Sequence, residues 1–345
     1  MAIKVLAPYI TERDVKAVTK AVKTGWVCNG AERKLFEESF AKYCGVKYAI
    51  STCNGTSALH LSLLSLGIGK GDEVIVPAMT YAATIHAVSY TGATPVIVDV
   101  LPDGNMDPSK ITLTPRTKAI IGVHLYGNPC NMMALTKFGV PVIEDACEAI
   151  GAIANRKRTG SLGKLGAFSF YGNKAITTGE GGMITTNDLR LYQRISHLKN
   201  HCMTQRYSHD GVGYNYEMSN LNASLGLSQL SQIDTVLARK RHIFDLYDFE
   251  LAFLKKIDHS ETSSRWLYSI STEYKDELIT FLTSRDIETR PFFTPLNKFP
   301  HYQGECPVAE SLHRNGICLP TDPNMTDKDI YTVINSIKTF YADKV

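Results

Sequence analysis

From residue 46 onward, short runs of apolar and β-branched residues alternate with segments of helical periodicity. Five runs are predicted to be strands: Tyr48–Ser51, Glu73–Pro77, Thr94–Val98, Ala119–His124 and Pro141–Glu144. Helical periodicity lies between them, at residues 56–66 and 80–90. Because short strands that alternate with helices usually form parallel pairs, the pattern predicts an α/β fold. The expected sheet is mainly parallel and has helices on both faces.

The segments on either side of this region complete the large domain. Two helices are expected before it, at residues 11–24 and 32–43, and two strands flanking a loop are expected within residues 165–186. From about Glu217 to Lys255 the pattern predicts a long helical stretch that bends near Asp234. Its apolar side chains have helical spacing: Leu221, Leu225, Leu230, Ile233 and Leu237.

A second, smaller domain is predicted after this helical stretch. Its expected strands are Trp266–Ser271 and Glu288–Pro291, and its expected helices are Lys275–Arg285 and Asp327–Tyr341. The predicted division is therefore a large domain at residues 1–235 and a smaller C-terminal α+β domain at residues 236–345.

Composition and charge exclude several classes of function. The 345 residues are 44% hydrophobic and carry a net charge of +3 that is spread along the chain, so a nucleic-acid partner is not expected. No apolar run reaches the ~18 residues of a membrane span, and the first residues do not resemble a signal peptide. The eight cysteines are scattered without a Cys-x-x-Cys pair. We therefore expect reduced thiols, no metal site and a cytoplasmic protein.

Three segments carry residues that could perform chemistry. The first is the turn Ser51–Ser57, which joins a predicted strand to a predicted helix. Gly55, Thr56 and Ser57 at the start of that helix offer backbone N–H groups and hydroxyls that suit a phosphate. An ordinary helix cap, which needs no ligand, is the simpler interpretation of the same residues taken alone.

The second segment is an apolar strand that runs into acidic residues, at Pro141–Glu148. Asp145 at such a strand end could be a metal ligand, a general base, a helix cap or the partner of a cofactor's ring nitrogen. The third segment places Lys174 in a glycine-rich loop between two apolar strands. A partly desolvated lysine can become a nucleophilic amine, although a solvated lysine on a glycine-rich hairpin is the simpler interpretation. Because the carboxyl ends of parallel strands share one edge, all three segments are expected to converge.

Taken together, these segments resemble the DegT/StrS-type sugar aminotransferases, which belong to the fold-type I pyridoxal-phosphate enzymes. The resemblance runs through nearly the whole chain. It is carried by Thr24–Trp26, Asn54–Leu59, Gly71–Pro77, Thr80–Thr84, Val123–Gly127, Ile143–Gly151 and Phe168–Gly182. The segments Phe168–Gly182 and Ile287–Phe293 are most similar to the perosamine-synthase branch. The resemblance implies a large domain with a mainly parallel sheet and pyridoxal 5'-phosphate as the cofactor.

The resemblance also implies roles for individual residues. Lys174 matches the lysine that holds the cofactor as a Schiff base and later moves protons. Asp145 matches the partner of the pyridinium nitrogen, and Glu148 a position beside the ring. The other implied cofactor contacts are Gly55, Thr56, Ser57, Tyr81, Ser169 and Asn173, of which Tyr81 stacks on the ring.

Three further residues match positions outside a single chain's cofactor pocket. Asn215 matches an asparagine that reaches the cofactor phosphate of the neighbouring subunit, which implies a homodimer, although it could simply be a turn residue before a helix. Trp26 and Arg290 lie in segments that approach the nucleotide sugar in this family. Trp26 could equally be an interface aromatic, and Arg290 could brace a turn.

The chain departs from the family pattern at a few positions. Asn297 stands where relatives often have histidine, Cys202 replaces a usual glycine, and Cys130–Met133 lacks a usual acidic residue. The expected function is transfer of an amino group from L-glutamate to C4 of a nucleotide-linked 4-keto-6-deoxyhexose. The alternatives are a 3-keto sugar or keto-cyclitol as substrate, and a cofactor-binding regulator without turnover.

Overall fold

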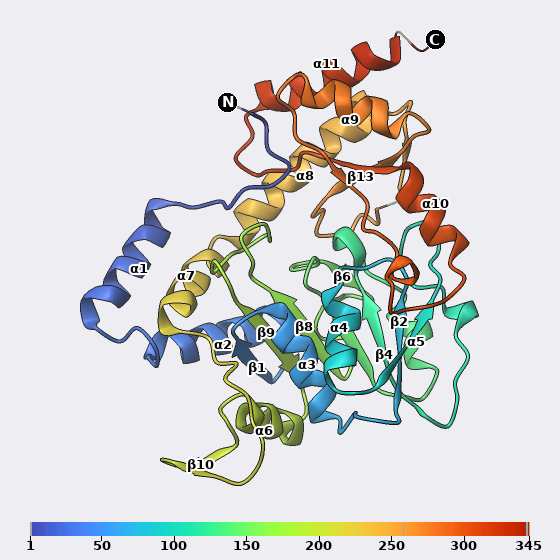
Figure 1. Ribbon diagram of the computed structural model, residues 1–345. Coiled ribbons are helices and arrows are strands. Elements are labelled where there is room, and N and C mark those ends of the chain that lie inside the picture. The colour runs from blue at the N-terminus through green and yellow to red at the C-terminus, as the bar shows by residue number, and fades with distance from the viewer. Residues whose placement is uncertain (1, 258, 343, 345) are drawn as a thin grey trace.

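A seven-stranded sheet forms the centre of the computed structural model, which describes residues 2–257, 259–342 and 344 (Figure 1). The strand order is β1-β9-β8-β5-β4-β2-β3, and β9 alone in this sheet runs against its neighbours. The strands are β1 (Tyr48–Thr52), β2 (Glu73–Pro77), β3 (Thr94–Val98), β4 (Thr117–Val123), β5 (Val142–Asp145), β8 (Leu165–Ser169) and β9 (Gly182–Thr186). The predicted α/β fold with a mainly parallel sheet is confirmed.

Helices cover both faces of this sheet. On one face lie α3 (Gly55–Ser65), α4 (Ala83–Tyr90) and α6 (Leu189–Leu198). On the other face lie α2 (Ala31–Cys44), α7 (Asn220–Leu230) and the short α5 (Met132–Thr136). Helix α1 (Glu12–Thr24) packs outside them, against α7. No helix of the described residues is long and apolar enough to cross a membrane.

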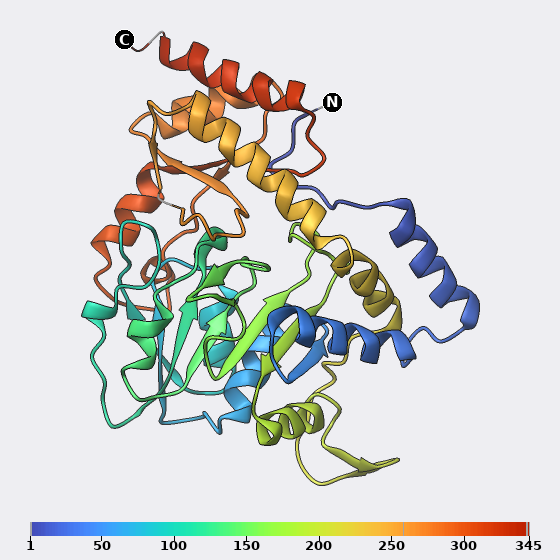
Figure 2. The ribbon, with the colours of Figure 1, turned by 180° about the vertical axis from the view of Figure 1, so that it is seen from behind.

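The bend predicted near Asp234 is present as a break in the helix, whereas the predicted ends of the helical stretch, Glu217 and Lys255, are wrong. The chain forms α7, breaks at residues 231–232, and continues as α8 (Ile233–Glu250), which runs toward α9 and α11 (Figures 1 and 2). At the break, the side-chain amide of Gln232 donates to Asp14 Oδ1 of α1 at 3.2 Å. This bond to a distant helix holds the turn close to Asp234, where the sequence predicts a bend.

A second, antiparallel sheet is formed by the C-terminal part of the chain. Its order is β12-β13-β15-β14, with β12 (Lys255–Lys256), β13 (Tyr268–Ser271), β14 (Arg290–Pro291) and β15 (Gly316–Leu319). Helices α8, α9 (Lys275–Thr283) and α11 (Asp327–Ala342) bury an apolar core against it, and α10 (Pro307–Asn315) packs on another cluster. This core is separate from those of the central sheet, which supports the predicted division near residue 235. That division stays a prediction.

The first residues of the chain pack with the C-terminal part rather than with the central sheet. Ile3 forms a parallel bridge with Ile287, and the Val5 N–H donates to the Glu288 carboxylate at 3.0 Å. The two short hairpins of the chain lie elsewhere. One is β6 (Ile153–Ala154) with β7 (Lys157–Arg158), and the other is β10 (Met203–Gln205) with β11 (Ser208–His209), which projects from the body beside α6 (Figure 1).

Candidate active site

Lys174 lies in the loop between β8 and β9, with its amine enclosed by groups from three parts of the chain. Its Nζ is 3.7 Å from Glu148 Oε1 and 4.1 Å from the centroid of the Trp266 ring, and the side chain is 12% exposed. The Trp266 indole N–H donates to the carbonyl of Asn173 at 2.9 Å, which ties the loop to the ring. A cation above an aromatic face is electrostatically stabilised. Lys174 is therefore a fixed, nearly buried amine and not a solvated loop residue.

Glu148 is the carboxylate partner of that amine. Its Oε2 accepts the backbone N–H of Tyr126 at 2.9 Å, and the residue is only 8% exposed. Burial raises the pKa of Glu148 to about 7, while the Lys174 amine and the Tyr126 N–H oppose the rise. The carboxyl group can therefore exchange a proton near neutral pH.

Asp145 ends strand β5 and is held by two donors. Its Oδ2 accepts the hydroxyl of Thr84 at 2.8 Å, and its Oδ1 accepts the N–H of Cys147 at 3.2 Å. Thr80 and Thr84 hydroxyl oxygens are 2.7 Å apart. Thr84 donates its single hydroxyl hydrogen to Asp145, so Thr80 donates to Thr84. This chain of hydroxyls orients a buried carboxylate that can hold a protonated ring nitrogen.

The third predicted segment forms the start of α3. Asn54 caps the helix, because its side-chain oxygen accepts the Ser57 N–H at 2.8 Å. The N–H groups of Gly55 and Thr56 belong to the first turn and need an acceptor from outside the helix. A Cβ on Gly55 would stand 2.9 Å from the Cβ of Ser169. The start of α3 is thus pressed against the end of β8, and only glycine fits there.

The residues around Lys174 offer a partner for each polar part of pyridoxal phosphate. The free N–H groups in the first turn of α3 could bind the phosphate, and the Asp145 carboxylate could pair with the ring nitrogen. The Lys174 amine could bond to the aldehyde carbon. In addition, Asn173 Oδ1 is buried with no hydrogen-bond partner among the described residues, as expected of a polar group that meets a ligand. The donor set therefore fits this cofactor.

Two predicted residues lie at the edge of this site. Tyr81 is 63% exposed, and its ring lies 5.9 Å from that of Phe293. Arg290 on β14 is half-buried near Cys318. Burial raises the pKa of Cys318 to about 12, the charge of Glu148 adds to the rise and Arg290 opposes it. The predicted role of Arg290 in binding the substrate stays a prediction.

The structure does not bring Trp26 and Asn215 to Lys174 within the single chain. Trp26 is 66% exposed between α1 and α2, where its carbonyl accepts from the Asn220 side chain at 2.8 Å. Asn215 is exposed, and its neighbour Tyr216 accepts the N–H of Cys53 beside the α3 turn. Their predicted roles in a dimer stay predictions.

Sequence reasoning missed Thr84, Trp266 and Tyr126 as site residues. Thr80 and Thr84 are four residues apart, a spacing that puts both hydroxyls on one helical face and could have revealed the pair. Tyr126 has a left-handed backbone with φ of 51°, and its hydroxyl accepts the Phe293 N–H at 3.1 Å. No local signal in the sequence indicated that role.

The fold and the site define a pyridoxal-phosphate aminotransferase of fold type I. The chain belongs to the DegT/DnrJ/EryC1/StrS aminotransferase family, whose model matches residues 8–338. It is 41% identical to GDP-perosamine synthase of Escherichia coli O157:H7, over 99% of both chains, and 41% identical to that of Caulobacter vibrioides, over 97% of both. The solved structure of the aminotransferase TlmJ from Streptoalloteichus hindustanus superposes with a TM-score of 0.96 at 29% identity, covering 100% of both chains.

Proposed function

We propose that the chain transfers an amino group from L-glutamate to C4 of a nucleotide-linked 4-keto-6-deoxyhexose, with pyridoxal 5'-phosphate as cofactor. The observation that carries this proposal is the enclosed Lys174 amine, 3.7 Å from Glu148 and above Trp266. The identity with two GDP-perosamine synthases supports a 4-keto sugar as acceptor and a 4-amino-4,6-dideoxy sugar of the perosamine or viosamine type as product. Such sugars serve polysaccharide biosynthesis.

The cofactor supplies an electron-accepting ring and a carbon to which amines bind. The first-turn N–H groups of Gly55 and Thr56 bind its phosphate, helped by the positive end of the helix dipole. Asp145, oriented by Thr84, keeps the ring nitrogen protonated so that the ring can accept electrons.

Lys174 carries out the proton transfers of the reaction. Its amine takes the proton from Cα of the amino-acid donor and, in the second half of the reaction, returns a proton to C4 of the sugar. Glu148, whose pKa is about 7, lies 3.7 Å from the lysine Nζ and helps to position the amine for these proton transfers. Trp266 holds the amine from the other side and limits its motion.

A homodimer is part of the proposal. Helices α1 and α2 and the loop between them expose large apolar side chains, which water does not favour and which a second copy could cover. These are Val15, Val22, Trp26, Val27 and Leu35. In such a dimer Trp26 would meet the partner's sugar substrate and Asn215 the partner's cofactor phosphate, while Arg290 would bind the diphosphate of its own chain's substrate.

The test of the reaction is an assay of the purified protein with L-glutamate and a panel of keto sugars. GDP-, dTDP- and UDP-linked 4-keto-6-deoxyhexoses are compared with a 3-keto sugar nucleotide and a keto-cyclitol, and products are identified by mass. The 4-keto sugars should gain an amine, Lys174→Ala should abolish the gain, and the exposed control Lys137→Ala should not. Conversion of the 3-keto sugar alone would overturn the substrate, and full activity of Lys174→Ala would overturn the role of the lysine.

The shared site is tested by mixing two inactive variants. If Asn215 acts on the partner's cofactor, unfolded and refolded mixtures of Lys174→Ala and Asn215→Ala should recover about a quarter of the wild-type rate, because half of the dimers are mixed and each has one intact site. No recovery in a mixture that forms mixed dimers would place Asn215 in its own chain's site.

A further inference from the structure

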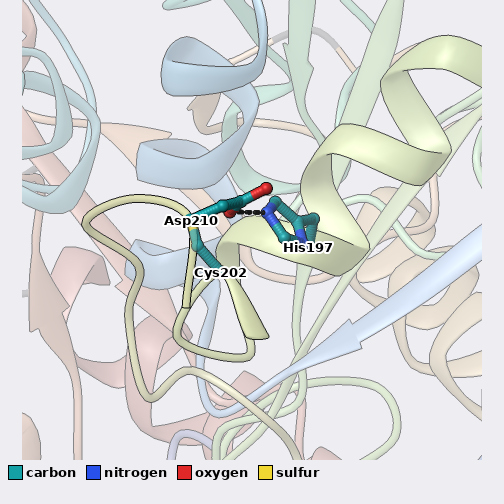
Figure 3. A group of neighbouring side chains, drawn as sticks. All are labelled: His197, Cys202 and Asp210. Carbon is teal, nitrogen blue, oxygen red and sulfur yellow. Dashed lines mark hydrogen bonds and ion pairs between the residues drawn. The ribbon is translucent and has the colours of Figure 1, made fainter. Parts of the chain in front are cut away.

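His197, Cys202 and Asp210 gather at the base of the β10–β11 hairpin, away from the site of Lys174 (Figure 3). The side chains come from the last turn of α6, from the turn that follows it and from the residue after β11. The His197 Nε2 is 2.6 Å from Asp210 Oδ1, and the ligand atoms of all three residues lie within 4.8 Å of one another. Cys202 is buried, while the other two side chains are partly exposed.

The backbone fixes the positions of the three residues. The Cys202 N–H donates to the His197 carbonyl at 3.0 Å, and the Asp210 N–H donates to the Cys202 carbonyl at 3.2 Å. Cys202 and the preceding His201 both adopt left-handed backbone, with φ of 49° and 57°. Non-glycine residues in this region cost about 1 kcal/mol or more each, so the fold maintains an unfavourable turn that carries the thiol inward.

We propose that His197, Cys202 and Asp210 bind a divalent transition-metal ion of the Zn²⁺ type, with water in the fourth position. An imidazole, a thiolate and a carboxylate are the ligands that Zn²⁺ takes in proteins, and the sulfur disfavours Mg²⁺ and Ca²⁺. The scattered cysteines, which form no Cys-x-x-Cys pair, predict no metal site from the sequence. The fold brings the residues together across the hairpin.

The distances require only a small movement. Tetrahedral Zn²⁺ with nitrogen and oxygen ligands holds those two atoms about 3.4 Å apart. His197 and Asp210 must therefore separate by somewhat under an ångström from their hydrogen-bonded distance of 2.6 Å. The ligand atoms also have to approach the buried sulfur from separations of up to 4.8 Å, and the half-buried His197 and the exposed Asp210 have room to rotate toward it.

An ion here would stabilise residues 199–216, the segment that contacts the turn before α3. The two ends of the loop at residues 199–214, which carries the β10–β11 hairpin, are joined by backbone hydrogen bonds. The His201 N–H donates to the Tyr214 carbonyl at 3.0 Å, and the Tyr214 N–H donates to the Leu198 carbonyl at 2.8 Å. Two residues further on, Tyr216 accepts the N–H of Cys53 at 2.9 Å. The ion would add a second connection across this loop, between His197, Cys202 and Asp210. It would leave the chemistry at Lys174 unchanged.

The test uses the chelator-treated holoenzyme with Co²⁺ and Zn²⁺ as probes. Co²⁺ should give intense ligand-field absorption at wavelengths longer than those of the bound cofactor, with one equivalent bound, and Zn²⁺ should abolish it by displacement. X-ray absorption of the Zn²⁺ protein should show one sulfur neighbour at about 2.3 Å. Cys202→Ser should lose that neighbour, whereas Cys28→Ser, at an exposed cysteine, should keep it.

Two side-chain variants protect the test against misfolding of the cysteine variant. His197→Gln and Asp210→Asn alter partly exposed groups, and each should weaken Zn²⁺ binding by about tenfold or more. Zn²⁺ should raise the thermal midpoint of the wild type but not of His197→Gln. The proposal is overturned if no stoichiometric ion binds, or if the sulfur neighbour remains in Cys202→Ser.

Discussion

The replacement Glu148→Gln should change how the stability of the cofactor-free protein depends on pH. In the folded chain the pKa of Glu148 is raised from 4.5 to about 7, chiefly by burial. Between these values the folded state binds a proton that the unfolded state has lost, so the free energy of unfolding falls as pH rises. Each pKa unit corresponds to about 1.36 kcal/mol, so the full loss above pH 7 is about 3 kcal/mol.

Glutamine has the shape of the protonated side chain and cannot lose a proton. Relative to the wild type, Glu148→Gln should therefore be more stable by about 1.4 kcal/mol at pH 5.5 and by about 3 kcal/mol at pH 8. Urea unfolding of both proteins across this range measures the difference. Glu180→Gln, at an exposed carboxylate, is the matched control and should follow the wild-type curve.

The reasoning is refuted if the curves of the wild type and Glu148→Gln run parallel from pH 5.5 to 8. That result would mean that the carboxyl group keeps its ordinary pKa beside Lys174. If the wild type instead became the more stable protein as pH rises, the pKa of Glu148 would be lowered and not raised. That result would mean that the Lys174 amine outweighs burial.

Three further predictions concern the surroundings of the site. Thr84→Val removes the hydroxyl that holds Asp145 and should weaken cofactor binding about tenfold or more in a fluorescence titration, while Thr84→Ser should bind as the wild type does. Gly182→Ala places a Cβ 2.4 Å from a carbonyl oxygen of the turn before α3. It should lower the free energy of unfolding by about 1–3 kcal/mol or more, which a lower thermal unfolding midpoint would reveal. Trp266→Phe removes the donor to the Asn173 carbonyl; urea unfolding should show a loss of about 1–3 kcal/mol, and an unchanged stability would exclude a structural role for that bond.

The central sheet and the convergence at its edge could be predicted because both follow from local pattern. Predicted strands at Glu73–Pro77 and Thr94–Val98 match β2 and β3 residue for residue. Once the strands are parallel, Asp145 and the segments of Gly55 and Lys174 must meet, since each follows the carboxyl end of a strand.

The enclosure of Lys174 could not be predicted because its partners come from distant loops. The Trp266 indole bonds to a carbonyl 93 residues earlier, and Tyr126 meets Glu148 only through an irregular backbone. Periodicity predicts a bend near Asp234 but not the bond that Gln232 makes there to Asp14, 218 residues earlier in the chain. Such contacts are set by packing and leave no periodic signal.

The strand-like start of the chain has a consequence for the order in which the protein is assembled. Val5 and its partner Glu288 lie 283 positions apart, and Ile3 pairs with Ile287 nearby. During synthesis these early residues leave the ribosome long before their partners are made. Their hydrogen bonds to residues 286–288 cannot form until that segment has been translated, which makes this a contact of very high sequence separation. Ile3 and Val5 are thus made well before the residues with which they pair.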